Sequence, residues 1–328
     1  MTTIQTNTTT DKHPAEARGL SYSVIGTGAI GGFYGGRLAR SGRTVRFLLH
    51  SDYEHVCAHG LQVDSCDGDF RIFPAGAYRS VEEMPKSDVI LVCLKSVNNP
   101  LLSRLLPPLL EEGAIVVLIQ NGIGLEPDLQ KVFPGLSIVA GLAFICSSKT
   151  GPGHIVHQCY GGINLGNYSC PEAKFQALLE DFRAAGLNAK DVPYLEARWK
   201  KAVWNMPFNG MTVALNTSTD QLLKHPATRQ FIYSQMLEVI GAAQSLGITA
   251  LTPAFADRMI QMTDEMTPYS PSMKLDYDYR RPMEIDYLYT RPIAEARAAG
   301  FAMPKLSMLE SELRFIQSQY LPDECIFG

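Results

Sequence analysis

The spacing of hydrophobic positions changes partway along the chain. Before residue 192, short runs of consecutive apolar residues alternate with stretches in which apolar residues recur every three or four positions. The runs predict strands at 22–25, 44–49, 89–94, 114–120 and 137–144, and the periodic stretches predict helices at 30–41, 101–112, 125–131 and 172–185. Because parallel strands need helical crossovers, this alternation predicts an α/β fold with a doubly wound Rossmann sheet.

Two shorter signals in the same half indicate antiparallel pairing. Apolar segments at 61–63 and 70–73 flank Asp67-Gly68, a dipeptide typical of tight hairpins. After the glycine-rich turn at 151–153, two short antiparallel strands are predicted at 154–157 and 162–165.

The second half of the chain has almost no strand signal. Helical spacing predicts helices at 195–216, 221–246, 254–266, 282–299 and 305–319. The pattern therefore predicts a disordered, threonine-rich tail over 1–18, a Rossmann NADP-binding domain over 19–192 and an all-α substrate-binding and catalytic domain over 193–328.

Composition narrows the class of protein. The 328 residues exceed what one hydrophobic core usually serves. A net charge of -4 gives no electrostatic reason to expect nucleic acid. No apolar run reaches the roughly 18 residues that a membrane span needs, and the first residues lack the apolar core of a signal peptide. The seven scattered cysteines form no C-x-x-C pair, so we expect reduced thiols in a cytoplasmic protein and no metal site.

A glycine-rich turn is the strongest single motif. It reads Gly26-Thr27-Gly28-Ala29-Ile30-Gly31 and stands between a predicted buried strand and a predicted helix. In this context Gly26 permits a tight turn, Gly28 lets the backbone approach a pyrophosphate, and Gly31 lets the helix pack on the strand. The free N–H groups of the helix N-terminus then favour an anion. The turn predicts a bound nicotinamide dinucleotide, although a glycine turn without a ligand has the same sequence.

The end of the second predicted strand bears on the choice between NAD and NADP. An acidic residue there holds the ribose 2′-hydroxyl of NAD, but this chain has His50 and then Ser51. These two side chains suit hydrogen bonds to a 2′-phosphate, with Arg46 as a further helper, so NADP is the predicted cofactor. The alternative is that His50 is only a loop residue.

A polar stripe stands out in the helical half. Lys201, Asn205 and Asn209 are spaced by four, which places them on one face of a helix, and apolar neighbours suggest that this face points inward. Buried polar groups need partners, and a bound ligand can supply them. A lysine in such a place can donate a proton, although Lys201 taken alone also fits an ordinary solvated helix face.

Two later residues belong to the same question. Ser272 precedes a short helix-like stretch and either caps it or faces a ligand. Glu284 stands among apolar residues, where a carboxylate is costly unless it is paired.

Taken together, these motifs make the chain similar to the ketopantoate reductases (2-dehydropantoate 2-reductases) over nearly its whole length after residue 18. The matching pieces, in order, are the glycine turn 26–32, Cys93-Leu94-Lys95, Gln120-Asn121-Gly122, Lys201 with Asn205 and Asn209, Ser272-Met273 with Asp276, and Arg281-Pro282-Met283-Glu284-Ile285-Asp286.

The resemblance implies an NADPH-dependent reduction of ketopantoate to pantoate, on the route to pantothenate and coenzyme A. It implies that Lys201 protonates the ketone oxygen and that Glu284 holds the substrate hydroxyl. It further implies that Asn205, Asn209 and Ser272 bind substrate. Asn121 is expected beside the nicotinamide and Lys95 at the cofactor cleft, with the active site between two domains. A small 2-oxo acid is then the partner, with a homodimer as one option.

Two departures from the family pattern affect these expectations. The family often has an arginine where this chain has His50, and large rings at Tyr287 and Tyr289 replace small residues. Two other functions therefore stay open: a reductase of the same family acting on another 2-oxo acid or ketone, and a dinucleotide-binding sensor without catalysis. The presence of both Lys201 and Glu284 argues against the sensor.

Overall fold

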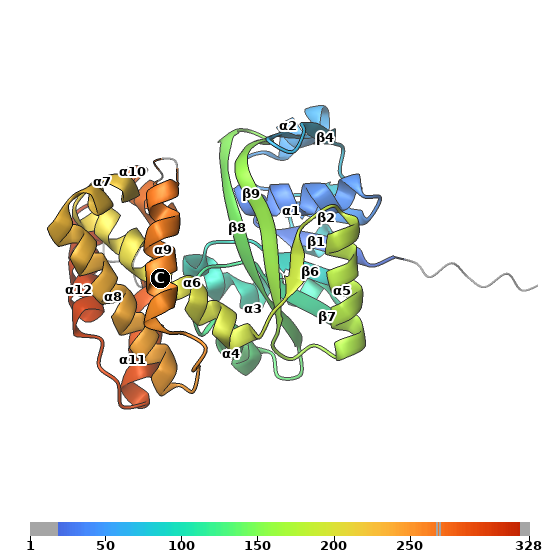
Figure 1. Cartoon of the computed structure of the whole chain (residues 1–328). Helices are drawn as coiled ribbons and strands as arrows, with labels where there is room; N and C mark the ends of the chain where they lie inside the picture. The colour runs from blue at the N-terminus through green and yellow to red at the C-terminus, as the bar shows by residue number, and fades with distance from the viewer. Residues whose placement is uncertain (1–18, 267, 269, 322–328) are drawn as a thin grey trace, which may run out of the picture.

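The chain folds into a sheet flanked by helices, followed by a bundle of helices (Figure 1). This computed structural model describes residues 19–321 except 267 and 269, so the predicted tail over 1–18 lies outside the described residues. None of the described helices combines the length and apolar character needed to cross a bilayer.

Six parallel strands form the centre of the sheet. Their order is β5 (Gly76–Tyr78), β2 (Thr44–Leu48), β1 (Ser21–Ile25), β6 (Ser87–Val92), β7 (Leu110–Leu118) and β8 (Ser137–Gly151). Numbered among themselves, these strands have the order 3-2-1-4-5-6 of the Rossmann fold. The predicted fold class is therefore confirmed.

The sheet continues beyond β8 with mixed pairing, through β9 (His154–Asn167), β3 (Leu61–Ser65) and β4 (Phe70–Ile72). β9 is antiparallel to β8, whereas β3 and β10 (Ala189–Asp191) are both parallel to β9. The hairpin at Asp67-Gly68 is confirmed, since β3 and β4 are antiparallel. The prediction of two short strands after residue 153 is wrong. Tyr160 has a φ of 69° and the register shifts there, so an irregularity interrupts one long strand without ending it.

Helices cover both faces of the sheet. α1 (Ala29–Arg40) and α5 (Glu172–Ala184) pack on one face, and α3 (Leu102–Leu105) and α4 (Leu125–Val132) pack on the other. The predicted helix over 101–112 is wrong beyond α3, because Pro107 and Pro108 cannot continue an α-helix, and β7 begins at Leu110. The short helix α2 (Tyr53–His59) had no clear signal in the sequence.

The helical part packs around its own apolar core, which includes the fully buried Trp199, Phe208 and Tyr289. Its helices are α6 (Tyr194–Ala214), α7 (Thr219–Lys224), α8 (Pro226–Ser245), α9 (Pro253–Glu265), α10 (Ser272–Asp278), α11 (Arg291–Ala298) and α12 (Pro304–Ser318). The single helix predicted over 221–246 is wrong, because Pro226 disfavours helical geometry at the preceding residue and starts a new helix. The helix predicted from 282 is also wrong at its start, where a π-helical turn over Asp286–Thr290 precedes α11.

Two glycines of the turn between β1 and α1 differ in the space around them. A Cβ atom on Gly31 would lie 2.3 Å from the Gly26 carbonyl oxygen, whereas a Cβ atom on Gly28 would meet nothing within 4 Å. We expect Gly31→Ala to lower the free energy of unfolding by about 1–3 kcal/mol through overpacking. We expect Gly28→Ala to lower it by less, about 0.5 kcal/mol, because the added methyl group meets nothing and only the preference of the helix N-cap for glycine over alanine is lost. Chemical denaturation of both variants measures this, and equal stabilities would contradict the packing role of Gly31.

Candidate functional site

The glycine turn has the geometry that a dinucleotide pyrophosphate needs. Gly26 has a φ of 91°, and a Cβ atom there would lie 2.6 Å from the Leu94 nitrogen. The Thr27 hydroxyl donates to the Leu48 carbonyl at 2.9 Å, which ties the turn to the end of β2. Gly28 is the N-cap of α1 and no side chain caps the helix, so the N–H groups of the first turn, which begins with Ala29 and Ile30, stay available to an anion. Open space at Gly28 and an uncapped helix N-terminus therefore fit the cofactor that the sequence predicted.

The end of β2 differs in part from the prediction. His50 is exposed just beyond the strand, and the Ser51 hydroxyl donates to Asp52 Oδ1 at 3.1 Å. The expectation for Arg46 is wrong, because its guanidinium donates to Ser87 Oγ at 3.2 Å, and Ser87 begins β6 at the opposite edge of the sheet.

Four polar side chains meet where β6 ends and the helical part begins. The Lys95 ammonium lies 2.7 Å from Asp276 Oδ2 and 3.5 Å from Glu284 Oε2. The Ser96 N–H and hydroxyl both donate to Glu284 Oε1, at 2.8 and 2.9 Å. Both carboxylates are buried. Glu284 therefore has the partners that a buried carboxylate requires, and the sheet supplies them.

The charges in this cluster stabilise one another. Desolvation lowers the pKa of Lys95, but Glu284 and Asp276 outweigh it and raise the pKa overall. Burial raises the pKa of Asp276 more than Lys95 and Arg281 lower it. Sequence reasoning identified Lys95 and Glu284 but not their contact, and it did not single out Ser96 or Asp276. The signal for Asp276 was its place in the matched motif that begins at Ser272.

Lys201 has a different environment. Its ammonium donates to the Ala143 carbonyl of β8 at 2.8 Å and lies 5.3 Å from the centre of the Phe144 ring. Burial, followed by the positive charge of Arg198, lowers the pKa of Lys201 to about 7, against an opposing effect of Glu284. An amine with this pKa can hold and release a proton near neutral pH. The solvated-face alternative describes the neighbouring Lys200 instead, whose half-buried side chain pairs with Glu196.

The predicted asparagines take different positions along α6. Asn205 lines the same small pocket as Lys201, together with Gly122 of the loop that follows Asn121. Asn209 is used within the protein: its Nδ2 donates to the Asn205 carbonyl at 2.9 Å, and its Oδ1 accepts from the Met273 N–H at 3.0 Å. Asn209 therefore holds the start of α10 in place.

Ser272 is the first residue of α10, directly before the N–H that Asn209 accepts. Pro271 occupies the N-cap position, and no side chain caps this helix. The capping explanation for Ser272 is therefore wrong, and the question of a ligand stays open for this residue.

Sequence reasoning missed Arg198, which lies three positions before Lys201 on the same helix. Arg198 is buried, forms an ion pair with Glu126 of α4, and donates to the Gln120 carbonyl at 2.5 Å. Gln120 in turn donates to the Leu94 carbonyl at 2.8 Å. Arg198 thus fixes α6 against the segment that leads to Asn121. The helical spacing that indicated Lys201 also includes Arg198.

The two tyrosines that depart from the family pattern have separate roles. Tyr287 lines the pocket and packs closely on Gly122, where an added Cβ atom would lie 2.5 Å from the Cβ atom of Tyr287. Tyr289 points into the helical core, where its hydroxyl donates to the Met206 carbonyl at 2.5 Å. Of these two rings, Tyr287 alone can affect the shape of the pocket.

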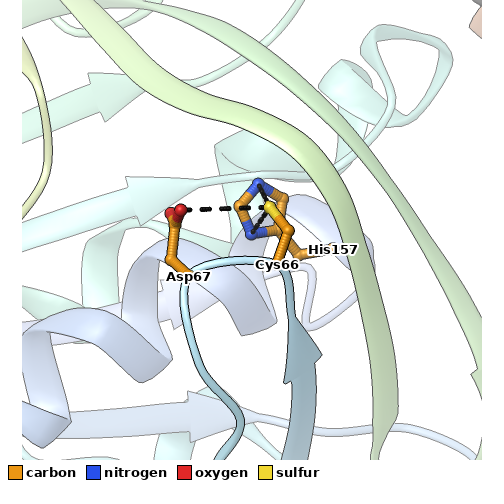
Figure 2. A group of neighbouring side chains, drawn as sticks. All are labelled: Cys66, Asp67 and His157. Carbon is orange, nitrogen blue, oxygen red and sulfur yellow. Dashed lines mark hydrogen bonds between the residues drawn. The ribbon is translucent and has the colours of Figure 1, made fainter.

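Cys66, Asp67 and His157 form a separate group of metal-ligating residue types near the β3–β4 turn (Figure 2). The Cys66 sulfur lies 3.8 and 3.9 Å from the two ring nitrogens, so it stands over the ring face. His157 Nδ1 is 2.8 Å from Ser65 Oγ, and Nε2 is 3.2 Å from the Cys159 carbonyl. A metal needs an imidazole lone pair at about 2.0–2.1 Å, and both nitrogens already have partners. The group therefore does not present a ready metal site.

Comparisons with known proteins find relatives that cover most of the chain. Residues 22–169 match the family described as ketopantoate reductase PanE/ApbA, and residues 194–317 match its C-terminal family. The chain is 40% identical over 305 residues to a 2-dehydropantoate 2-reductase of Nostoc sp. (strain PCC 7120), covering 91% of this chain and 95% of the relative.

Solved structures share the fold of this chain. A 2-dehydropantoate 2-reductase from Geobacter metallireducens GS-15 superposes with a TM-score of 0.87 at 36% identity, covering 90% of this chain and 99% of that one. D-mandelate dehydrogenase, solved with NADH and anilino(oxo)acetate, has the same fold at 22% identity, with a TM-score of 0.83 and coverage of 92% and 99%. The two family matches and the similarity to the Nostoc enzyme show that the chain belongs to the ketopantoate reductase family.

Proposed function

We propose that the protein reduces the ketone of 2-dehydropantoate to give pantoate, with NADPH as the cofactor. The observation that carries the proposal is the environment of Lys201, whose pKa falls to about 7 beside a pocket that it shares with Asn205. The Nostoc and Geobacter relatives, both named as 2-dehydropantoate 2-reductases, support the choice of substrate.

The cofactor binds along the carboxyl edge of the sheet in this proposal. Its pyrophosphate lies on the glycine turn over 26–31, and its nicotinamide lies near Asn121 and Lys95. When bound, the reduced nicotinamide supplies the hydride for the ketone carbon. The protein supplies the position and charge of the groups around the substrate.

Lys201 acts as the general acid. Its ammonium exchanges the Ala143 carbonyl for the ketone oxygen, stabilises the negative charge that develops there, and donates the proton. Glu284 accepts a hydrogen bond from the substrate hydroxyl, and Ser96 keeps the carboxylate oriented. Asn205 and Ser272 donate to the substrate, while Asn209 and Arg198 are positioning residues.

A reductase acting on a different 2-oxo acid stays as the second candidate, because the large ring of Tyr287 lines the pocket. The non-catalytic sensor is less favoured, since a protein without catalysis has no need for a lysine of depressed pKa beside an oriented glutamate. Oxidation of NADPH and of NADH, each with 2-dehydropantoate and with a panel of other 2-oxo acids, separates the three. Turnover that is fastest with another acid would replace the proposed substrate.

Lys201 and Lys200 form a matched pair for testing the general acid. We expect Lys201→Ala to lower kcat for reduction by about 10²–10⁴-fold, the range that general acids contribute, while binding of NADPH stays within about twofold. Lys200→Ala should keep kcat, because this half-buried side chain pairs only with Glu196 among the described residues. Steady-state kinetics and cofactor titration measure both, and a Lys201→Ala enzyme with near-normal turnover would exclude the assignment.

The pKa of Lys201 predicts opposite pH dependences for the two directions. Below about pH 7 the amine carries the proton that reduction needs, and above this pH it has lost it. We therefore expect kcat for reduction to fall as the pH rises above about 7, and kcat for pantoate oxidation to rise over the same range. Lys201→Arg, which stays protonated, should lack this falling limb even if it is slow. Identical profiles for the wild-type and Lys201→Arg enzymes would contradict the role.

Two further expectations stay predictions, namely a homodimer and a cytoplasmic location. Light scattering and cell fractionation test them independently of the activity.

A further inference from the structure

The residues at the end of β2 do not by themselves explain how the protein would bind the 2′-phosphate of NADP. The adenosine ribose of a dinucleotide lies at this strand end in Rossmann folds, and a nearby arginine accommodates the 2′-phosphate of NADP. Arg46 of β2 is bound to Ser87 at the opposite edge. His50 is exposed here, but an imidazole lacks the forked donors of a guanidinium.

Asp52 is not available to bind the ribose 2′-hydroxyl of NAD, as an acidic residue near this strand end does in NAD-binding Rossmann folds. Its buried carboxylate accepts from the Gly153 N–H at 2.9 Å and lies 2.6 Å from the Lys149 ammonium. Both partners belong to the region where β8 turns into β9. The Asp52 carboxylate therefore faces this hairpin and is satisfied there.

The neighbouring strand brings an arginine to the same edge. β5 runs parallel to β2, with Tyr78 opposite Leu48. The Leu49 N–H donates to the Tyr78 carbonyl at 2.8 Å, so the two chains leave the sheet side by side. Arg79 follows Tyr78 directly and enters the region beside His50.

Arg79 is already held in a position suited to bind an anion. Its guanidinium carbon lies 4.5 Å from the centre of the Tyr53 ring, and the group forms an ion pair with Glu54. The side chains of Arg79 and Glu54 are 55% and 79% exposed. An exposed ion pair contributes little to stability, whereas a phosphate offers a guanidinium two parallel charge-assisted hydrogen bonds. A phosphate can therefore displace Glu54 while Tyr53 keeps the guanidinium plane in place.

We propose that Arg79, which directly follows β5, binds the 2′-phosphate of NADPH, and that Glu54 is the partner which this phosphate displaces. The inference rests on the proposed NADPH-dependent activity and identifies the residue that determines its cofactor preference. The Glu54 carboxylate then weakens binding of the phosphate, because it competes with the phosphate for Arg79.

Binding of 2′,5′-ADP and of 5′-ADP, measured by calorimetry, tests the proposal without turnover. The wild-type protein should bind 2′,5′-ADP more tightly. Arg79→Ala should weaken binding of 2′,5′-ADP by about 10- to 100-fold, as loss of a charged hydrogen-bonding group does, and leave 5′-ADP unchanged. Arg79→Lys should lie between the two, since it keeps the charge and loses the fork. Glu54→Gln should tighten 2′,5′-ADP several-fold.

Arg71→Ala is the matched control. Arg71 is an exposed arginine of β4 whose side chain donates to Gln62 at 2.9 Å, and β4 stands at the other end of the sheet from β5. This variant should bind both nucleotides as the wild type does. In kinetics, Arg79→Ala should raise KM for NADPH and leave kcat and KM for NADH unchanged.

The possible failures are distinguishable. If the wild type prefers 2′,5′-ADP and Arg79→Ala keeps that preference, another group binds the phosphate, and the inference falls while the proposed function stands. If the wild type binds both nucleotides equally and turns over 2-dehydropantoate with NADH, the proposed cofactor falls together with the inference. A loss of 5′-ADP or NADH binding in Glu54→Gln would instead identify Glu54 as the acid that holds a free ribose hydroxyl, and would overturn the proposal.

Discussion

Buried charges at the junction of sheet and helices must be paired, and the position of the site groups depends on these pairs. Glu284 and Asp276 come from the helical part, and they are satisfied by Lys95 and Ser96 of the segment that follows β6. Arg198 of α6 and Glu126 of α4 form a second buried pair across the same junction. Removing one member of the Arg198–Glu126 pair, which is buried on both sides, is expected to cost about 3–5 kcal/mol, because the other charge stays buried alone. The contacts that join the two parts of the chain therefore also orient the groups of the site.

Lys95 and Lys201 differ in pKa because their partners at this junction differ. Desolvation lowers the pKa of both, but Lys95 meets two carboxylates and its pKa rises overall. Lys201 meets a backbone carbonyl and an aromatic ring, with Arg198 nearby, and its pKa falls to about 7. One lysine thus holds its proton to neutralise the carboxylates, and the other is able to release its proton. The difference comes from the partners and not from the depth of burial.

Local signals in the sequence predicted the features that depend on local physics. The glycine turn, the central parallel strands and the hairpin at Asp67-Gly68 follow from steric and hydrophobic patterns that span a few residues. The errors arose where one residue interrupts a periodic pattern. Pro226 divides a helical stretch without disturbing its apolar spacing, and the irregularity at Tyr160 looks like a gap between two strands.

The site was predictable residue by residue but not as a set of contacts. The stripe of Lys201, Asn205 and Asn209 does face inward. However, spacing cannot show that Asn209 accepts a hydrogen bond from the backbone of α10, or that Lys95 contacts a carboxylate 189 positions away. Arg79 belongs to none of the sequence motifs that indicated the site. Its place depends on the parallel pairing of β5 with β2, which is a property of the folded sheet.

The π-helical turn over Asp286–Thr290 explains how the loop bearing Asn121 is attached to the helical part. Within this turn the Arg291 N–H donates to the Asp286 carbonyl, five residues earlier. The same register would pair the Tyr287 carbonyl with residue 292, but Pro292 has no N–H to donate. The Tyr287 carbonyl accepts instead from the Ile123 N–H at 2.9 Å, two residues after Asn121. A proline and a widened turn thus leave one carbonyl free to bind the loop. This hydrogen bond joins Ile123 to Tyr287, and both residues line the pocket that also contains Lys201.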